Sequence, residues 1–444
     1  LCGAGGIDCP ARAAAVWQRI QDAGEQAYDR SAACEFTTLI AYEWSGTRKL
    51  ANLHRNVIFR TRDVPAAPIS HFEAPTALEL WTRLQSECRE GLKNCDVLAI
   101  PHNSNFSDGR DFDWYMSDGK PINAMYALQR SLNEPLVEIA QNKGSSETAP
   151  DLSASDEFAN FEIMDHIYVG ETEAVHKGGY VRQGLGRGLV VQARTGANPF
   201  KMGFVGASDF HNALSASDEN AFAGGANSID ASTMLPGNDR AREALDMTGL
   251  SKVIRPNGQR ENDPLQYSSA AITGVWAEEN TRASIFAALK RRETFATSGT
   301  RIRVRMFGGW DFAANTLTDN GWVAKAYQIG APMGGDMPAK PKAKKAPTFV
   351  VQAMKDASGA NLDRIQIVKI WLEGDDYKEK IFNVALSGKR RTDAAGAAPP
   401  VGNTVNLSDG SYTNTIGATE LGAVWTDAEF DPAKPSIYYA RVLE

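Results

Sequence analysis

Asp96-Val-Leu-Ala-Ile-Pro-His-Asn103 is the stretch of sequence on which the fold prediction depends. Residues 97–100 form a short, continuous apolar run, which is typical of a strand buried on both faces. His102 follows this strand after a single proline. The stretch therefore predicts that a histidine able to bind a metal lies where a buried strand ends.

Strands and helices alternate over the first two-thirds of the chain. Near-continuous apolar strands separated by helices are typical of a parallel sheet or barrel that helices cover. The predicted strands are residues 36–42, 56–59, 96–100, 136–140 and 202–207, and the predicted helices are residues 10–28, a helix capped by Thr76 and a helix capped by Asn280 or Thr281. We therefore expect an α/β domain over residues 1–299.

The pattern changes after about Gly299. Short segments of alternating apolar and polar residues follow, separated by turns, and no convincing helix lies between them. This pattern is typical of an antiparallel β-sandwich. We expect a β-sandwich-like domain over residues 300–444. Because the last histidine in the sequence is His211, we also expect this domain to supply no metal ligand.

Several histidine and acidic residues lie near the ends of the predicted strands. In an α/β barrel the carboxyl ends of the strands converge on one face, so side chains far apart in sequence can meet there. Histidine and carboxylate ligands together suit Zn, Mn or Fe. His54 fits less directly, since it stands at the head of a strand rather than its tail. The candidate ligands are Glu43, His54, His102, Glu138, Asp209 and His211.

Each candidate also has a purely structural interpretation. A single histidine after a strand makes a structural hydrogen bond more often than it binds a metal. Asp209 and His211 are sharper candidates, because their i, i+2 spacing after an apolar strand points both side chains the same way. Glu43 and Glu138 lie beside or within apolar strands, where carboxylates are rare unless they are paired or bound to a metal.

Composition and charge exclude several classes of protein. The formal net charge of −7 argues against a nucleic-acid-binding protein, which normally presents a basic face. No apolar run approaches the roughly 20 residues needed to cross a bilayer, so no transmembrane segment is predicted. The sequence contains neither a glycine-rich dinucleotide motif nor a nucleophile elbow.

The five cysteines all lie in the first quarter of the chain. Cys88 falls near the end of a predicted helix and Cys95 just before a predicted strand, so we expect a disulfide between them. Cys9 and Cys34 flank the first helix and are the next candidate pair, which leaves Cys2 for a partner upstream. Disulfides require an oxidising compartment, so the protein is expected to be periplasmic or secreted. Five reduced thiols in a cytosolic enzyme are the alternative.

Both ends of the chain look cut. Leu1 is not a start methionine, and no signal peptide follows it. The last residues resemble the middle of a strand. We therefore expect a fragment of a longer protein, which associates with the missing N-terminal segment.

The ordered motifs resemble those of a known superfamily. Glu43, His54, His102, Glu138 and the Asp209-x-His211 pair, in that order, are similar to the later metal motifs of the polymerase-and-histidinol-phosphatase superfamily. Within it the chain resembles the domain-of-unknown-function 3604 family across nearly its whole length. The motifs that carry this resemblance are Cys2-Gly-Ala-Gly-Gly, Leu53-His-Arg-Asn-Val-Ile-Phe, Pro101-His-Asn-Ser-Asn and Phe307-Gly-Gly-Trp-Asp.

The resemblance implies a fold and a chemistry. The fold would be a distorted (β/α)7 barrel, N-terminally incomplete here, followed by the β-sandwich-like region. It would hold two or three divalent metal ions and hydrolyse phosphoesters. Two departures matter. No His-x-His pair precedes Glu43, so the first ligands would lie upstream of Leu1. Related sequences also carry a histidine in the segment matching residues 141–143, and cysteines near Glu147 and Phe161. This chain has neither the histidine nor these cysteines.

The functional interpretation is a metal-dependent hydrolase, expected to be a phosphoesterase, whose nucleophile is a metal-bound hydroxide. Its substrate would be a small-molecule ester or phosphoester. Asn103, Asn105 and Lys143 are candidates for orienting that substrate. Two alternatives remain open. The same metals could hydrolyse another bond, such as a sulfate or carboxylic ester, or the chain could be a non-catalytic scaffold associated with the cell envelope.

Overall fold

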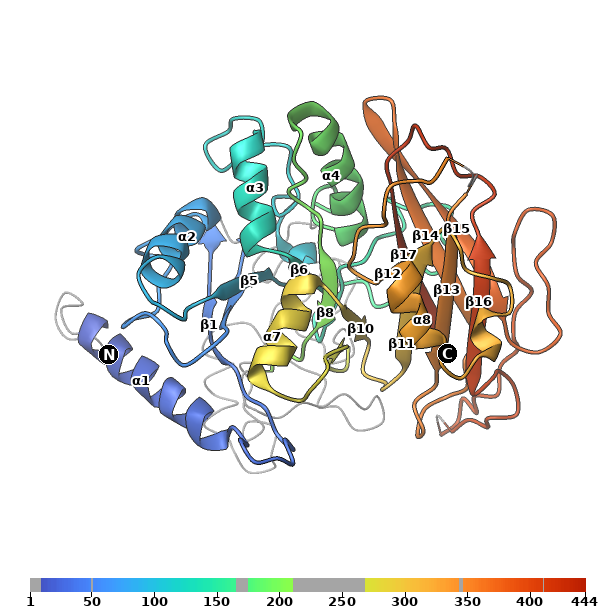
Figure 1. Cartoon of the computed structure of the whole chain (residues 1–444), viewed down its shortest axis with the longest axis horizontal. Coiled ribbons are helices and arrows are strands. Elements are labelled where there is room, and N and C mark those ends of the chain that lie inside the picture. The colour runs from blue at the N-terminus through green and yellow to red at the C-terminus, as the bar shows by residue number, and fades with distance from the viewer. Residues whose placement is uncertain (1–8, 49–50, 165–174, 211–267, 343–345, 410) are drawn as a thin grey trace. The chain divides into compact units, whose positions relative to one another are not determined.

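The computed structural model describes residues 9–48, 51–164, 175–210, 268–342, 346–409 and 411–444 (Figure 1). The chain divides into two compact units. The first comprises Leu1–Gly184 and Val191–Ala296, and the second comprises Leu185–Val190 and Thr297–Glu444. None of the helices in the described ranges is both long and apolar enough to cross a membrane.

The strands of the first unit form small, separate sheets. One sheet has the order β1-β4-β5, with both pairs antiparallel. A second has the order β7-β6-β8, in which β6 and β8 are parallel. Two two-stranded sheets, β2-β3 and β10-β9, complete the described part of this unit. The strands are β1 (Ile40–Trp44), β2 (Thr47–Arg48), β3 (Ala51–Asn52), β4 (Arg55–Phe59), β5 (Val97–Pro101), β6 (Leu136–Gln141), β7 (Gly144–Ser145), β8 (Gly203–Gly206), β9 (Ile272–Val275) and β10 (Thr294–Thr297).

The expectation of a (β/α)7 barrel is wrong, because the sheets are small, separate and partly antiparallel. The short β2-β3 hairpin lies between β1 and β4, and the described residues of this connection contain no helix. A parallel pair needs a crossover of a dozen or more residues, usually a helix, whereas a short turn returns the chain antiparallel. The short connection therefore returns β4 against β1. β5 also runs against β4, although the longer connection between them contains a helix, Ala77–Leu84. The apolar runs predicted the strands but not their directions.

Three helices of the first unit begin at a residue whose side chain caps the helix. Thr76 forms a capping box: its hydroxyl accepts from the backbone N–H of Glu79, and the Glu79 carboxylate accepts from the backbone N–H of Thr76 at 2.9 Å. A cap of this kind contributes about 1 kcal/mol. Thr281, rather than Asn280, caps the last helix of the unit. The helices are α1 (Cys9–Ala27), α2 (Ala77–Leu84), α3 (Ala124–Asn133), α4 (Val181–Thr195) and α7 (Arg282–Arg291). The middle of α4, Leu185–Val190, is assigned to the second unit.

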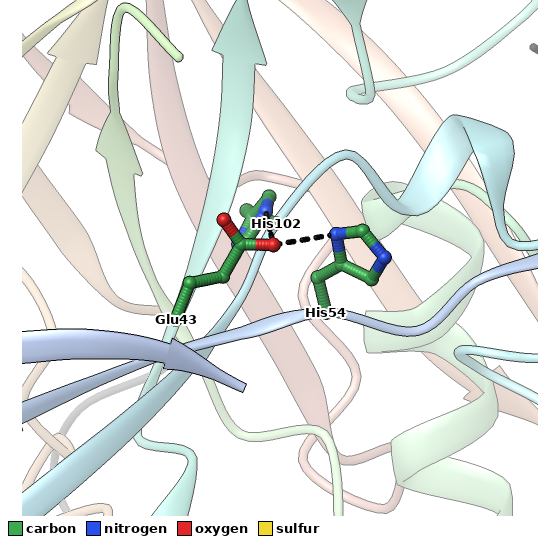
Figure 2. A group of neighbouring side chains, drawn as sticks. All are labelled: Glu43, His54 and His102. Carbon is green, nitrogen blue, oxygen red and sulfur yellow. Dashed lines mark ion pairs between the residues drawn. The ribbon is translucent and has the colours of Figure 1, made fainter. Parts of the chain in front are cut away.

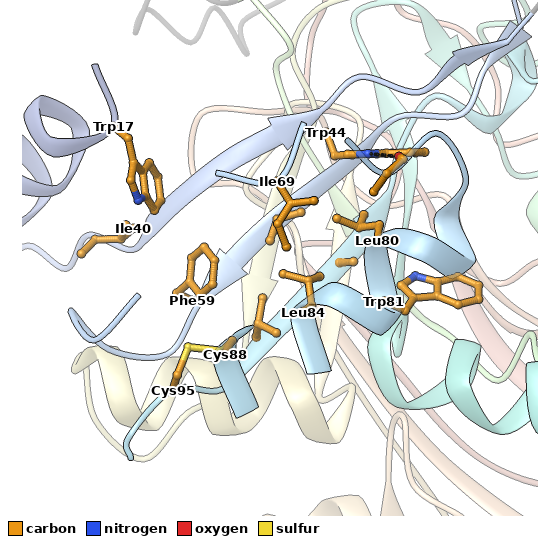
Figure 3. Packing of buried hydrophobic residues seen from close by; sticks show 14 residues of the cluster. Trp17, Ile40, Trp44, Phe59, Ile69, Leu80, Trp81, Leu84, Cys88 and Cys95 are labelled. Carbon is orange, nitrogen blue, oxygen red and sulfur yellow. Dashed lines mark hydrogen bonds between the residues drawn. A yellow bond between two sulfur atoms is a disulfide. The ribbon is translucent and has the colours of Figure 1, made fainter. Parts of the chain in front are cut away.

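A hydrophobic core joins α1, α2 and the β1-β4-β5 sheet (Figure 3). Trp17 of α1 packs against Phe59 of β4, with ring centroids 6.0 Å apart. Its indole N–H donates to the carbonyl of Pro65 at 2.8 Å, so burying the ring leaves no donor unsatisfied. This core covers one side of the sheet that carries Glu43, and so stabilises the strands that position it.

The predicted disulfide between Cys88 and Cys95 is confirmed (Figure 3). It closes the chain between a π-helical turn, Gln85–Arg89, and the start of β5. The expected pairing of Cys9 with Cys34 is wrong, because Cys34 carries a free thiol. The 19-residue helix α1 separates the two cysteines along the chain and is about 28 Å long at 1.5 Å per residue. Two residues at opposite ends of a helix of this length therefore lie far apart. Cys2 lies outside the described residues.

The second unit contains two antiparallel sheets, with the orders β12-β11-β13-β16 and β15-β14-β17. Phe349 of β13 packs on Tyr438 of β17 with ring centroids 4.4 Å apart, so aromatic side chains join the two sheets. One helix, α8 (Trp322–Ile329), lies in a region where no helix is predicted. Trp322 of this helix is buried and packs on Phe307, so tertiary contacts stabilise a helix that the local sequence pattern does not indicate. The strands are β11 (Arg303–Gly309), β12 (Gly330–Pro332), β13 (Thr348–Met354), β14 (Arg364–Glu373), β15 (Asp376–Leu386), β16 (Glu420–Thr426) and β17 (Ser436–Leu443).

Candidate metal centre

Three of the six candidate ligands meet at one edge of the β1-β4-β5 sheet. Figure 2 shows the carboxylate of Glu43 directed toward the imidazoles of His54 and His102. Its Oε1 lies 2.8 Å from Nδ1 of His54 and 3.9 Å from Nε2 of His102. One donor atom from each residue lies within 4.8 Å of the others. This spacing is short enough for all three to bind a single ion.

The antiparallel sheet explains why these residues converge. Glu43 is near the end of β1, His54 directly precedes β4 and His102 directly follows β5. Because β4 runs against both neighbours, its head lies at the same edge as their tails. The backbone N–H of His102 donates to the carbonyl of His54 at 3.4 Å. The position of His54 at the head of a strand, which fits a parallel barrel poorly, is the one that this sheet requires.

The protonation states of the group suit metal binding. Burial tends to raise the pKa of Glu43, but the hydrogen bond from His54 and the nearby His102 lower that pKa to about 2. Burial lowers the pKa of His102 to about 4, even though Glu43 and Asp209 oppose the shift. At neutral pH the carboxylate is therefore ionised and the His102 ring is neutral. Metal binding requires these forms of the two side chains.

His102 also has an unsatisfied polar atom. Its side chain is 3% exposed, and its Nδ1 has no hydrogen-bond partner. Buried polar atoms in folded proteins are normally paired, so this one is unusual. The nitrogen of His102 that faces Glu43 is the other one, Nε2, which lies 3.9 Å from Oε1 of Glu43. With two imidazoles and one carboxylate, the donor set matches the ligands that Zn²⁺ and similar ions prefer.

A second charged group, Glu138, Lys143 and Asp209, adjoins the first. The backbone N–H of Asn103, next to His102, donates to Oε1 of Glu138 at 3.1 Å. Lys143 and Asp209 form a buried ion pair. Asp209 follows β8, which pairs in parallel with the strand of Glu138, and its backbone has a φ of 55°. Asp209 also raises the pKa of His102, which places the two groups within electrostatic reach of each other.

The six predicted ligands do not form a single group. Among the residues that the structure describes, the three-residue group comprises Glu43, His54 and His102. Glu138 and Asp209 belong to the adjoining group rather than to this one. His211 lies outside the described residues, so its predicted role is untested.

The three residues predicted to orient a substrate lie in a buried network. The side-chain amide of Asn52 donates to Asn103 at 2.9 Å, and that of Asn103 donates to Asn105 at 2.7 Å. Asn105 in turn donates to the backbone carbonyl of Lys143 at 3.1 Å. Asn103 has a φ of 54°, a left-handed conformation that asparagine tolerates better than most residues. The network holds the loop after β5, and contact of these residues with a substrate stays a prediction.

Two hydroxyl groups that the sequence analysis missed complete the site. The Ser45 hydroxyl donates to Oε1 of Glu43 at 2.9 Å, and the Thr47 hydroxyl lies 2.8 Å from Nε2 of His54. Glu43, Ser45 and Thr47 are spaced by two residues. In extended chain this spacing places side chains on one side, and it is the signal from which both hydroxyls were predictable.

Raising the pH from about 5 to 8 should destabilise the metal-free protein through Glu138. Burial and the charge of Asp209 raise the pKa of Glu138 from its ordinary 4.5 to about 8. Between these values the unfolded chain has lost a proton that the folded chain keeps, so stability falls as pH rises. Glu138→Gln removes this titration. In urea unfolding with a chelator present, the wild type should lose stability relative to the variant over this range. A difference between the two that is independent of pH would contradict the prediction.

Comparison with known proteins places this chain in one family. The sequence profile of DUF3604, which is described as a protein of unknown function, matches residues 2–444. Neither a curated protein nor a solved structure matches the chain. Because the profile covers almost the whole chain, the chain belongs to the DUF3604 family.

Proposed function

We propose that this protein is a metal-dependent hydrolase of ester bonds, with phosphoesters as its substrate class. The observation that carries the proposal is the group of Glu43, His54 and His102, whose donor atoms lie within 4.8 Å of one another. The buried His102 supports it, because its Nε2 lies 3.9 Å from the same oxygen of Glu43 and its pKa of about 4 keeps the ring neutral, as a ligand must be. Three protein ligands, rather than four, are typical of catalytic sites that leave a position open for substrate.

A divalent cation at such a site supplies a water of lowered pKa and neutralises charge on a phosphoryl oxygen. The chain itself supplies an ionised Glu43 and a neutral His102, so little free energy is spent on changing their protonation. Burial of His102 strengthens its electrostatic interactions, while Glu43 and His54 stay partly exposed.

Glu138 and Asp209 are the proposed ligands of a second ion. They are two buried carboxylates with Lys143 as a cationic partner, and the pKa of Glu138 is raised to about 8 in the absence of metal. A second cation would neutralise both carboxylates, which the lysine alone does not do. His211 is a further candidate ligand of this second ion. Zn, Mn or Fe would fit the resulting combination of histidine and carboxylate ligands. Membership of the polymerase-and-histidinol-phosphatase superfamily rests on the same order of residues and is part of this proposal.

Export from the cytoplasm is likewise a proposal. It is supported by the Cys88–Cys95 disulfide, since such bonds persist in oxidising compartments. The periplasm or the extracellular space would suit an enzyme that acts on small phosphoesters from the surroundings.

The test is metal quantification combined with a panel of chromogenic esters. The purified protein, supplied with Zn²⁺, Mn²⁺ or Fe²⁺, should retain stoichiometric metal. It should also hydrolyse aryl phosphomonoesters or phosphodiesters, and a chelator should abolish this activity. Preference for aryl sulfates or carboxylic esters would replace the substrate class but keep the metal site. A protein that retains no stoichiometric metal would instead support the non-catalytic scaffold.

A further inference from the structure

Both ring nitrogens of His54 have a partner. Nδ1 lies 2.8 Å from Oε1 of Glu43, and Nε2 lies 2.8 Å from the hydroxyl of Thr47. A neutral imidazole carries one proton, so one nitrogen donates and the other accepts. An ionised carboxylate only accepts, whereas a hydroxyl both donates and accepts. When the His54 ring of the metal-free site is neutral, Glu43 therefore holds the proton on Nδ1, and the Thr47 hydroxyl donates to Nε2.

A cation at the three-residue group changes this arrangement. The nitrogen of His54 that faces Glu43 is Nδ1, and a metal ligand must present a lone pair. The proton then belongs on Nε2, where a hydroxyl can accept it. We propose, resting on the metal site proposed above, that Thr47 is a positioning residue that accepts the Nε2–H of His54 and so selects the tautomer that binds the cation through Nδ1.

The backbone around Thr47 is held in place for this role. Thr47 pairs with Asn52 in the β2-β3 hairpin, and the Asn52 side chain donates to Asn103, which adjoins His102. The hairpin is thus tied to the loops that carry both histidines. Gly46 precedes Thr47 and packs against the Trp44 ring, so closely that a Cβ would lie 2.3 Å from it. Only glycine allows this approach, so the direction in which the chain reaches Thr47 is restricted.

A different chemistry could use the same three residues. Hydroxyl, imidazole and carboxylate in this order also form the relay of covalent hydrolases, in which Thr47 would be the nucleophile. The second imidazole favours the metal. Nε2 of His102 lies 3.9 Å from the same oxygen of Glu43. A relay has no use for this residue, whereas a metal site does.

The experiment compares Thr47→Val, which keeps the shape of the side chain without the hydroxyl, with Thr47→Ser, which keeps the hydroxyl. Zn²⁺ affinity is measured by competition with a chelator. Loss of a partner that orients a ligating histidine typically weakens binding 10–100-fold, and because Thr47 is exposed to water we expect about tenfold for valine and near-normal affinity for serine. Thr82→Val is the matched control, since Thr82 is an exposed threonine of α2 whose hydroxyl bonds only within its helix.

A second measurement reads the tautomer directly. In the Zn²⁺-loaded protein, ¹⁵N chemical shifts should show Nε2 of His54 protonated and Nδ1 coordinated. Coordination through Nε2, or equal affinity of the wild type and Thr47→Val, would overturn the inference while leaving the metal site intact. Failure of the wild type to bind any cation would overturn the metal site as well. Chelator-insensitive hydrolysis that Thr47→Val abolishes and Thr47→Ser retains would replace both with the covalent relay.

Discussion

Glu43→Gln should remove the ion proposed for the three-residue group of Glu43, His54 and His102 and, with it, hydrolysis. The substitution keeps the size of the side chain and leaves an oxygen that can still accept from His54. It removes the only negative charge of the three-residue group, so two neutral imidazoles would remain to hold a dication. Changes outside the ligand set cost 10–100-fold in metal affinity, so losing a charged ligand should cost more than about 100-fold. Inductively coupled plasma mass spectrometry on protein equilibrated with Zn²⁺ or Mn²⁺ measures the loss.

The matched control for this prediction is His176→Ala. His176 pairs with Asp151 at 2.6 Å and does not belong to the metal group, so its removal should leave metal content unchanged. Circular dichroism of both variants separates loss of the site from loss of the fold. Normal metal content and full activity in Glu43→Gln would contradict the assignment of the metal centre. His211→Ala is the corresponding test for the predicted ligand outside the described residues.

Arg55→Leu should destabilise the first unit by about 3–5 kcal/mol, the usual effect of removing one partner of a buried ion pair. Arg55 is 3% exposed and lies 2.7 Å from Asp111 and 2.9 Å from Glu134. Burial tends to lower the pKa of Arg55, but these two carboxylates raise it above its usual value. Arg130 pairs with the same two acids, so the network holds two positive and two negative charges. Without Arg55 it would hold one uncompensated buried charge.

Urea unfolding followed by tryptophan fluorescence measures this loss of stability. The control is Lys120→Ala, which removes an exposed ion pair with Asp118 and should leave the urea midpoint unchanged, since exposed pairs contribute little. Arg55 directly follows His54, so the same substitution should also weaken metal binding. An Arg55→Leu midpoint equal to that of the wild type would show that the network does not stabilise the unit.

Local features of the sequence determined the elements themselves. The apolar run of residues 97–100 predicts β5, and the Thr76 and Glu79 pair predicts the start of α2. A helix end followed closely by a strand predicts the Cys88–Cys95 disulfide. Each of these depends on neighbours in sequence, such as the period of apolar residues, the hydrogen bonds of a helix end or a short loop. The residue types that suit a metal were likewise visible, and three of the five candidate ligands that the structure describes meet in one group.

Only the tertiary structure decided how the elements combine. A buried apolar run has the same pattern whichever way its neighbours run, so the sequence pattern did not reveal that β4 is reversed. That reversal replaces the expected barrel with separate sheets, and it brings His54, at the head of β4, beside Glu43 and His102. The direction of a strand depends on the segment that connects it to its neighbour and on the packing of both faces of the sheet. Contacts between distant parts of the chain determine that packing. The ion network of Arg55 likewise depends on contacts between distant parts of the chain, because the partners of Arg55 lie 56 and 79 residues away.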